Sequence, residues 1–260
     1  MKKHFLLLIF VLLSRSFFAS AQKLPNKQET GVYAPADIKI DGTAKEWQVQ
    51  FQAYNHAIET WYTISNDEEN LYLIFRSNET EVTQKIITGG ITLTISSVDK
   101  KSAITPVSIT YPVVPWMSSQ VDYLLKPAGQ IKKSDLTFLN KKINDKLKEI
   151  KISGVTSIPD GAISVYNDLG IKGAHLLDDQ KNYTCEITFP LALIKHLIDD
   201  KGTFAYRVQV TGIDLKTTVI VGGTGPGGAA PPSTEAVPHG MLYDSSPTYF
   251  SATYTLAKKP

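Results

Sequence analysis

The sequence has little of what cross-linked or reactive proteins depend on. It contains one cysteine, Cys185, so no disulfide can form within the chain. No two of its five histidines are spaced three to five residues apart, as zinc-binding pairs on one helix are. It has no G-x-S-x-G motif of an α/β-hydrolase and no phosphate-binding GKS or GKT. The sequence therefore predicts a protein without catalytic residues, and an enzyme is kept only as a third alternative.

An excess of charge of one sign is also missing. Lysine and arginine number 27 against 25 aspartate and glutamate residues, a formal net charge of +2. Without residues 1–21 the chain loses Lys2, Lys3 and Arg15 and no acid, which lowers the net charge by three to −1. A chain so close to neutral has no electrostatic basis for binding nucleic acid or an anionic membrane. We therefore expect no nucleic-acid partner.

Long hydrophobic runs are absent except at the start. Residues 5–13 form an unbroken apolar run of nine, about half of the ~20 that a membrane-spanning helix needs. Lys2 and Lys3 precede this run, and Ala19 and Ala21 place small residues before a cleavage site. An uncleaved anchor is the alternative, but the short run favours cleavage. We predict a signal peptide at residues 1–21, cleavage after Ala21, export to the periplasm or beyond, and no membrane span.

What the chain has in abundance is short strand signals separated by turns. Residues 60–65 and 71–76 flank the polar turn 66–70, which indicates a hairpin with Leu71, Leu73 and Phe75 on one face. Further strand signals lie at residues 91–96, 107–111, 162–166, 183–189, 204–211, 217–221 and 249–256. This pattern predicts an all-β fold, an antiparallel β-sandwich with one or two short helices. We expect an extended leader at residues 22–36 and a single sandwich domain at 37–260.

Two segments have helical signals. Ser134 is a candidate cap for a helix that reaches about Ile150, because apolar residues recur every three or four positions: Leu136, Leu139, Ile143, Leu147 and Ile150. A recognition helix is one interpretation of this stripe, but a helix laid across one end of the sandwich explains it more simply. A shorter helix is predicted after Pro190, over residues 191–197.

One stretch is of low complexity. Residues 222–238 are rich in glycine and proline, which predicts a mobile loop. Residues 223–228 match the spacing G-x-G-x-x-G, but prolines follow where a dinucleotide site requires a helix. We therefore expect no nucleotide cofactor.

Acidic residues gather at three places, residues 67–69, 178–179 and 199–200. Calcium binds six to eight oxygens and is often held by loops, so each cluster is a possible calcium ligand. None has the EF-hand spacing, and solvated turns explain such clusters without a metal. The sequence assigns no metal site and no cofactor.

The three tryptophans are the best candidates for binding residues, because aromatic faces stack on sugars and anchor protein interfaces. Trp47 follows a turn among core-forming residues, and we expect it to be buried and structural. Trp116 lies in a loop restricted by prolines, and Trp61 lies on a strand. We predict that Trp116 and Trp61 bind ligand. The alternative for Trp116 is that its side chain plugs one end of the sandwich.

Three motifs resemble the start and end of one family of domains. They are Ile40-Asp41-Gly42 with Glu46-Trp47, Asn70-Leu-Tyr-Leu-Ile-Phe75, and Glu186-Ile-Thr-Phe-Pro190-Leu191. Together they are similar to the family 9 carbohydrate-binding modules and the related DOMON domains of exported bacterial proteins. The resemblance implies a β-sandwich in which these motifs hold the fold together without touching ligand. Family 9 modules clamp a sugar between two tryptophans, and the haem-binding DOMON branch uses methionine and histidine ligands.

These observations predict an exported, non-catalytic domain that binds carbohydrate or another cell-envelope ligand. The alternative is a structural or protein-interaction module of the envelope that has no sugar ligand.

Overall fold

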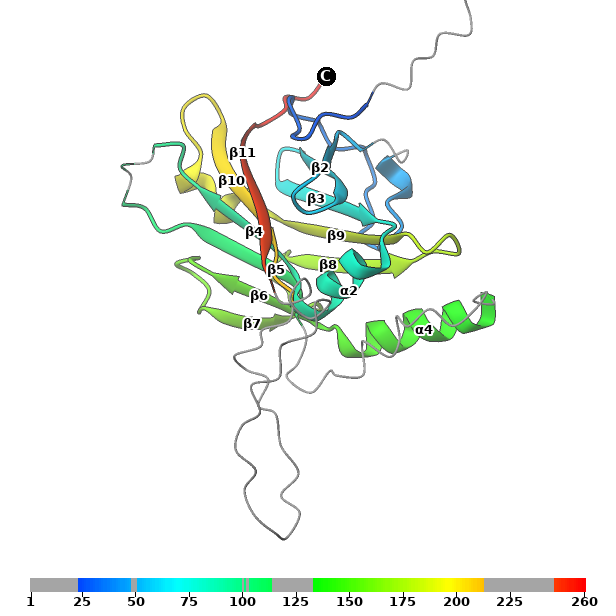
Figure 1. The fold of residues 1–260 in the computed structure, drawn as a ribbon. Coiled ribbons are helices and arrows are strands. Elements are labelled where there is room, and N and C mark those ends of the chain that lie inside the picture. The colour runs from blue at the N-terminus through cyan, green and yellow to red at the C-terminus, as the bar shows by residue number, and fades with distance from the viewer. Residues whose placement is uncertain (1–22, 48–50, 100, 102, 114–132, 213–245) are drawn as a thin grey trace, which may run out of the picture.

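The computed structural model describes residues 23–47, 51–99, 101, 103–113, 133–212 and 246–260. Two antiparallel sheets pack face to face in it (Figure 1). The first sheet has five strands, in the order β1 (Ala53–Asn55), β2 (Thr60–Asn66), β3 (Asn70–Ser77), β9 (Tyr183–Pro190) and β8 (Lys172–Leu177). The second has six, in the order β11 (Thr248–Thr255), β10 (Thr203–Val210), β4 (Ile91–Ser96), β5 (Val107–Val113), β6 (Glu149–Ser153) and β7 (Gly161–Ser164). The predicted antiparallel β-sandwich is confirmed.

The core lies between the two sheets, and strand alternation decides which side chains enter it. Leu71, Leu73 and Phe75 of β3 are at most 1% exposed, as their spacing predicts. The hydroxyl oxygens of Tyr62 in the first sheet and Tyr206 in the second are 3.1 Å apart inside this core. The two sheets are thus joined by apolar packing and by buried polar contacts, of which this is one.

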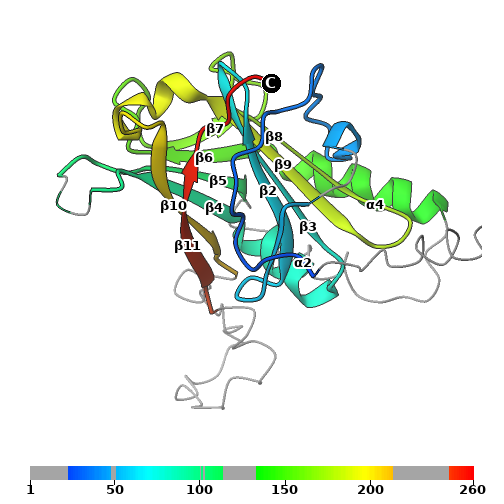
Figure 2. The same cartoon turned by 90° about the horizontal axis from the view of Figure 1, so that it is seen from above.

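Two α-helices of the described residues flank the sheets. The helix α2 (Thr80–Gly89) follows β3 directly and buries Val82, Ile86 and Ile87, a stripe that the sequence prediction missed. The helix α4 (Lys133–Lys146) lies along β8 (Figure 2). No helix in these ranges is long and apolar enough to cross a bilayer.

Two helix predictions need correction. The helix predicted to reach Ile150 ends at Lys146, because Ile150 and Ile152 alternate in β6 and pair with β7. The predicted helix at 191–197 is two short 3₁₀ turns, η3 (Leu191–Leu193) and η4 (Lys195–Leu197). A third 3₁₀ turn, η2 (Lys45–Trp47), precedes β1. In both corrected cases the apolar residues are where they were expected, but the backbone around them differs.

Two side-chain amides close the edges of the first sheet. Gln28 donates to Ile64 O and accepts from Ile64 N, both at 2.8 Å, so the leader lies beside β2 (Figure 2). Asn140 of α4 donates to Leu177 O at 2.8 Å and accepts from Leu177 N at 2.9 Å. Each amide therefore gives one strand residue the donor and acceptor that a neighbouring strand would give. We call Gln28 and Asn140 the edge amides.

Candidate functional site

A row of five side chains, four of them partly exposed and one buried, crosses the outer face of the first sheet. Strand register places one residue from each of the five strands side by side, and their sequence neighbours on β2, β3 and β9 point into the core. We call this set the outer row, and in strand order it consists of Tyr54, Trp61, Arg76, Thr184 and Leu176.

Two aromatic rings form one half of the outer row. The ring centroids of Tyr54 and Trp61 are 4.9 Å apart and tilted by 57°, and His56 meets Tyr54 edge-on at 5.0 Å. Tyr54 and Trp61 are partly buried, whereas His56 is exposed. Because β-strands hold Tyr54 and Trp61 in register, the two rings form a fixed apolar surface.

Arg76 sits beside Trp61 and is fixed by two contacts. Its Nε donates to Thr184 Oγ1 at 3.0 Å, and its guanidinium carbon lies 5.2 Å from the centre of the Phe51 ring. The guanidinium is therefore oriented by a hydrogen bond and by a cation–π contact. Its terminal nitrogens have no carboxylate partner in the part of the chain that the structure describes.

Negative charge lies near the tyrosine end of the row. Burial raises the pKa of Tyr54, and the nearby carboxylates of Glu59 and Glu79 raise it further. Its hydroxyl stays neutral at physiological pH and is able both to donate and to accept a hydrogen bond. The row thus has a neutral aromatic end flanked by acids, and the cation of Arg76 lies at its centre.

The other half of the same sheet face is covered by the segment that carries the first family motif. The carboxylate of Glu186 accepts hydrogen bonds from Asp41 N at 3.0 Å and Gly42 N at 2.7 Å. Burial raises the pKa of Glu186 to about 7, although these two N–H groups lower it. The Trp47 indole also lowers this pKa, but Trp47 Nε1 and Glu186 Oε1 do not meet hydrogen-bond geometry. The first and third motifs of the resemblance therefore contact one another.

The prediction for Trp47 needs a correction. Its ring packs 5.8 Å from that of Tyr72, in a small cluster on the outside of the first sheet, and it is partly buried. The motif that carries it folds over the sheet and does not enter the space between the sheets. Trp47 therefore packs against this outer cluster and does not belong to the main core.

The two tryptophans predicted to bind ligand are not brought together by the described structure. Trp61 lies on the outer face, opposite to Tyr62 and Ile64, as the alternation predicts. Trp116 and the glycine-rich loop at 222–238 lie outside the described residues. Tyr54 and Arg76 were missed as site residues. The alternation of 71–76 already placed Arg76 on the outer face, but nothing local to Tyr54 indicated a strand of three residues.

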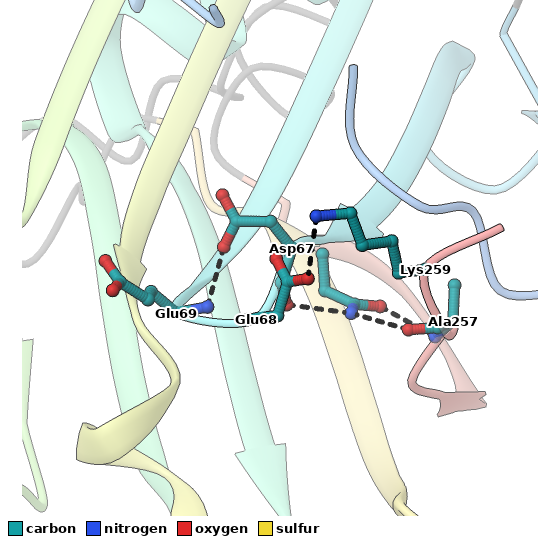
Figure 3. A network of polar contacts seen from close by, with 6 residues as sticks. Asp67, Glu68, Glu69, Ala257 and Lys259 are labelled. Atoms are coloured by element: carbon teal, nitrogen blue, oxygen red, sulfur yellow. Dashed lines mark hydrogen bonds and ion pairs between the residues drawn. The ribbon is translucent and has the colours of Figure 1, made fainter. Parts of the chain in front are cut away.

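The acidic clusters form turns. Asp67 Oδ1 accepts from Glu69 N at 2.8 Å and Asn70 N at 2.6 Å, and its Oδ2 accepts from the Tyr72 hydroxyl at 2.6 Å. Figure 3 shows this turn next to Lys259, whose Nζ is 3.7 Å from Glu68 Oε1. Both oxygens of the Asp67 carboxylate therefore accept hydrogen bonds from residues of its own hairpin.

The other two acidic clusters repeat this arrangement. Asp178 accepts from the backbone of Gln180 and Asn182, and Asp199 accepts from that of Lys201 and Thr203. Across the described ranges, no group of three or more histidine, cysteine, aspartate or glutamate side chains is arranged to hold a metal.

A second polar cluster lies between the sheets. Tyr111 O–H and His175 Nδ1 are 2.7 Å apart, and the ring of Tyr183 stacks on His175 at 5.7 Å. Burial lowers the pKa of His175 to about 4 and raises the pKa of Cys185 above its usual range. Cys185 is fully buried, so it is a protonated structural thiol and not a nucleophile.

Comparisons of the chain with protein-family models and with curated protein sequences find no match.

Proposed function

We propose that this protein is an exported, non-catalytic binding domain whose ligand is a carbohydrate held on the outer row. The observation that carries the proposal is the pair of rings, Tyr54 and Trp61, fixed 4.9 Å apart on the outer face of the sheet. The apolar face of a sugar stacks on an aromatic ring, while its hydroxyls need polar neighbours. His56 and Arg76 supply polar groups beside the rings.

Rigidity supports this proposal as well. Tyr54 and Trp61 pair directly across β1 and β2, and Trp61 pairs in turn with Arg76. A surface that is ordered before the ligand arrives loses little conformational entropy on binding. With few rings available, we expect a dissociation constant in the range of about 1 μM to 1 mM.

The test is calorimetric titration of the mature protein with neutral and acidic oligosaccharides. Trp61→Ala is expected to weaken binding at least about tenfold, as is usual for an anchoring aromatic. The matched control is Tyr249→Ala, which removes a ring that is 53% exposed on the second sheet. Thermal unfolding checks that each variant is folded. If no glycan binds the wild type at millimolar concentration, the carbohydrate proposal is wrong.

Trp116→Ala belongs in the same titration, because the sequence predicts that Trp116 is a binding residue too. If Trp116→Ala abolishes binding and Trp61→Ala does not, the sugar stacks on Trp116 and not on the outer row.

The second candidate is a protein-interaction module. Tyr166 and Leu169, in the loop between β7 and β8, are 76% and 44% exposed. Two apolar side chains so close in one loop are a common feature of protein contacts. A protein partner lost on Tyr166→Ser, with no glycan bound, would favour this alternative.

A further inference from the structure

Arg76 is the one member of the outer row with a formal charge. Its Nε is occupied by Thr184, and its flat face is covered by Phe51 at 5.2 Å. The side chain is partly buried on a sheet face, and no carboxylate among the described residues pairs with it. A partly desolvated cation gains from an anionic partner more than a fully hydrated one does.

Arg207, the other arginine on the surface of the sandwich, provides a comparison for the surroundings of Arg76. Arg207 of β10 is exposed, lies 3.6 Å from the centre of the Tyr249 ring, and donates to Gln209 Oε1 at 3.0 Å. Arg207 is thus on the second sheet, next to a single ring. Arg76 differs because it adjoins an aromatic pair and is held by a buried threonine.

We propose that the outer row recognises sugars that carry a carboxylate, that is, uronic acids. This inference rests on the proposed carbohydrate function. The terminal nitrogens of Arg76 bind the carboxylate, since a planar guanidinium matches a planar carboxylate through two parallel hydrogen bonds. The rings of Trp61 and Tyr54 bind the sugar face.

The charges around the row give the ligand a direction. Glu59 and Glu79 lie near the Tyr54 hydroxyl and repel an anion at that end. The carboxylate therefore lies over Arg76 at the centre of the row, and neutral sugar hydroxyls lie at the Tyr54 end. The recognised group is a uronic acid residue followed by a sugar whose nearest groups are uncharged.

The experiment titrates the mature protein with tetrasaccharides of galacturonate, glucuronate and mannuronate, and with the fully methyl-esterified form of each. The ester keeps the sugar faces and removes the charge. We expect at least one acid to bind the wild type about tenfold to a hundredfold more tightly than its ester, as a charged hydrogen-bonded pair should. Raising NaCl from 50 to 500 mM should reduce this preference.

Arg76→Gln should remove the preference, so that each acid and its ester bind the variant with affinities equal within about threefold, whether or not both bind more weakly than to the wild type. Arg76→Lys should keep part of the preference, because lysine has the positive charge but cannot form the two parallel hydrogen bonds of a planar guanidinium. Arg207→Gln is the matched control and should change nothing. Equal binding of every acid and its ester to the wild type, or a preference that survives Arg76→Gln, would overturn the inference while the carbohydrate function stands. Absence of all binding, neutral glycans included, would overturn both.

Discussion

Replacing Glu186 by glutamine is expected to uncover a pH dependence of stability that the native protein conceals. Glu186 is fully buried beneath residues 41–47, and burial raises its pKa from 4.5 to about 7. The folded protein therefore binds a proton more readily than the unfolded chain does. This contribution to stability is complete below about pH 4.5 and is lost as the pH rises through 7. The difference between these two pKa values corresponds to about 3 kcal/mol of stability.

His175 acts in the opposite direction over almost the same pH range. Burial lowers its pKa from 6.5 to about 4, so the unfolded chain binds the proton more readily. This contribution is complete above about pH 6.5 and is lost as the pH falls through 4. The size of the shift again gives about 3 kcal/mol. In the wild type the two contributions cancel between about pH 4.5 and 6.5.

The measurement is urea denaturation at half-unit steps from pH 4 to 7.5, with tryptophan fluorescence as the signal. The free energy of unfolding of the wild type should vary by less than about 1 kcal/mol between pH 4.5 and 6.5. That of Glu186→Gln should rise by about 3 kcal/mol from pH 4 to 6.5, and that of His175→Gln should fall by about 3 kcal/mol from pH 4.5 to 7.

The exposed Glu149 of β6 offers the matched control, since Glu149→Gln should leave the wild-type profile unchanged. The comparison concerns slopes, so a loss of stability that is the same at every pH does not affect it. A Glu186→Gln profile parallel to that of the wild type would refute the reasoning.

Three further predictions concern stability and processing. Trp47→Ala should lower the free energy of unfolding by about 2 kcal/mol in urea denaturation, less than the 3–5 typical of a fully buried aromatic, and a larger loss would mean that Trp47 supports the main core. Asn140→Ala should cost about 1–2 kcal/mol and speed amide hydrogen exchange at Leu177, whose N–H loses its acceptor; unchanged exchange would contradict this. Intact-mass measurement of exported protein should find a chain beginning at Gln22, and a chain that retains Met1 would contradict cleavage after Ala21.

The faces of the long strands could be predicted from the sequence because alternation is a local property. Leu71, Leu73 and Phe75 enter the core, and Trp61 faces outward, as expected. The end of α4 could not be predicted so well, because Ile150 satisfies both the helical stripe and the strand alternation of β6. Pairing with β7 decides between them, and that pairing is a tertiary contact.

The candidate site was predicted in part for the same reason. Trp61 could be found because tryptophan is rare and this one lies on a predicted strand. The residues that surround it in the site belong to other strands, so they could not be found in the same way. Arg76 is 15 positions away along the chain, and Thr184 is 108 positions beyond Arg76. Only the register of β2, β3 and β9 brings them together, and no local pattern encodes that register.

The edge amides are two positions at which deamidation would alter the edge of the sheet. Deamidation of Gln28 or Asn140 would replace the nitrogen that donates to Ile64 O or Leu177 O by a carboxylate oxygen. A carboxylate would then face the strand carbonyl and repel it, so the amide would no longer cover the edge of the sheet. An open strand edge is the usual template for pairing with another chain. Deamidation at either position would therefore be expected to promote association through the first sheet, at places that adjoin the outer row: Asn140 binds the neighbour of Leu176, and the leader that carries Gln28 accepts from Tyr54 N through Pro25 O.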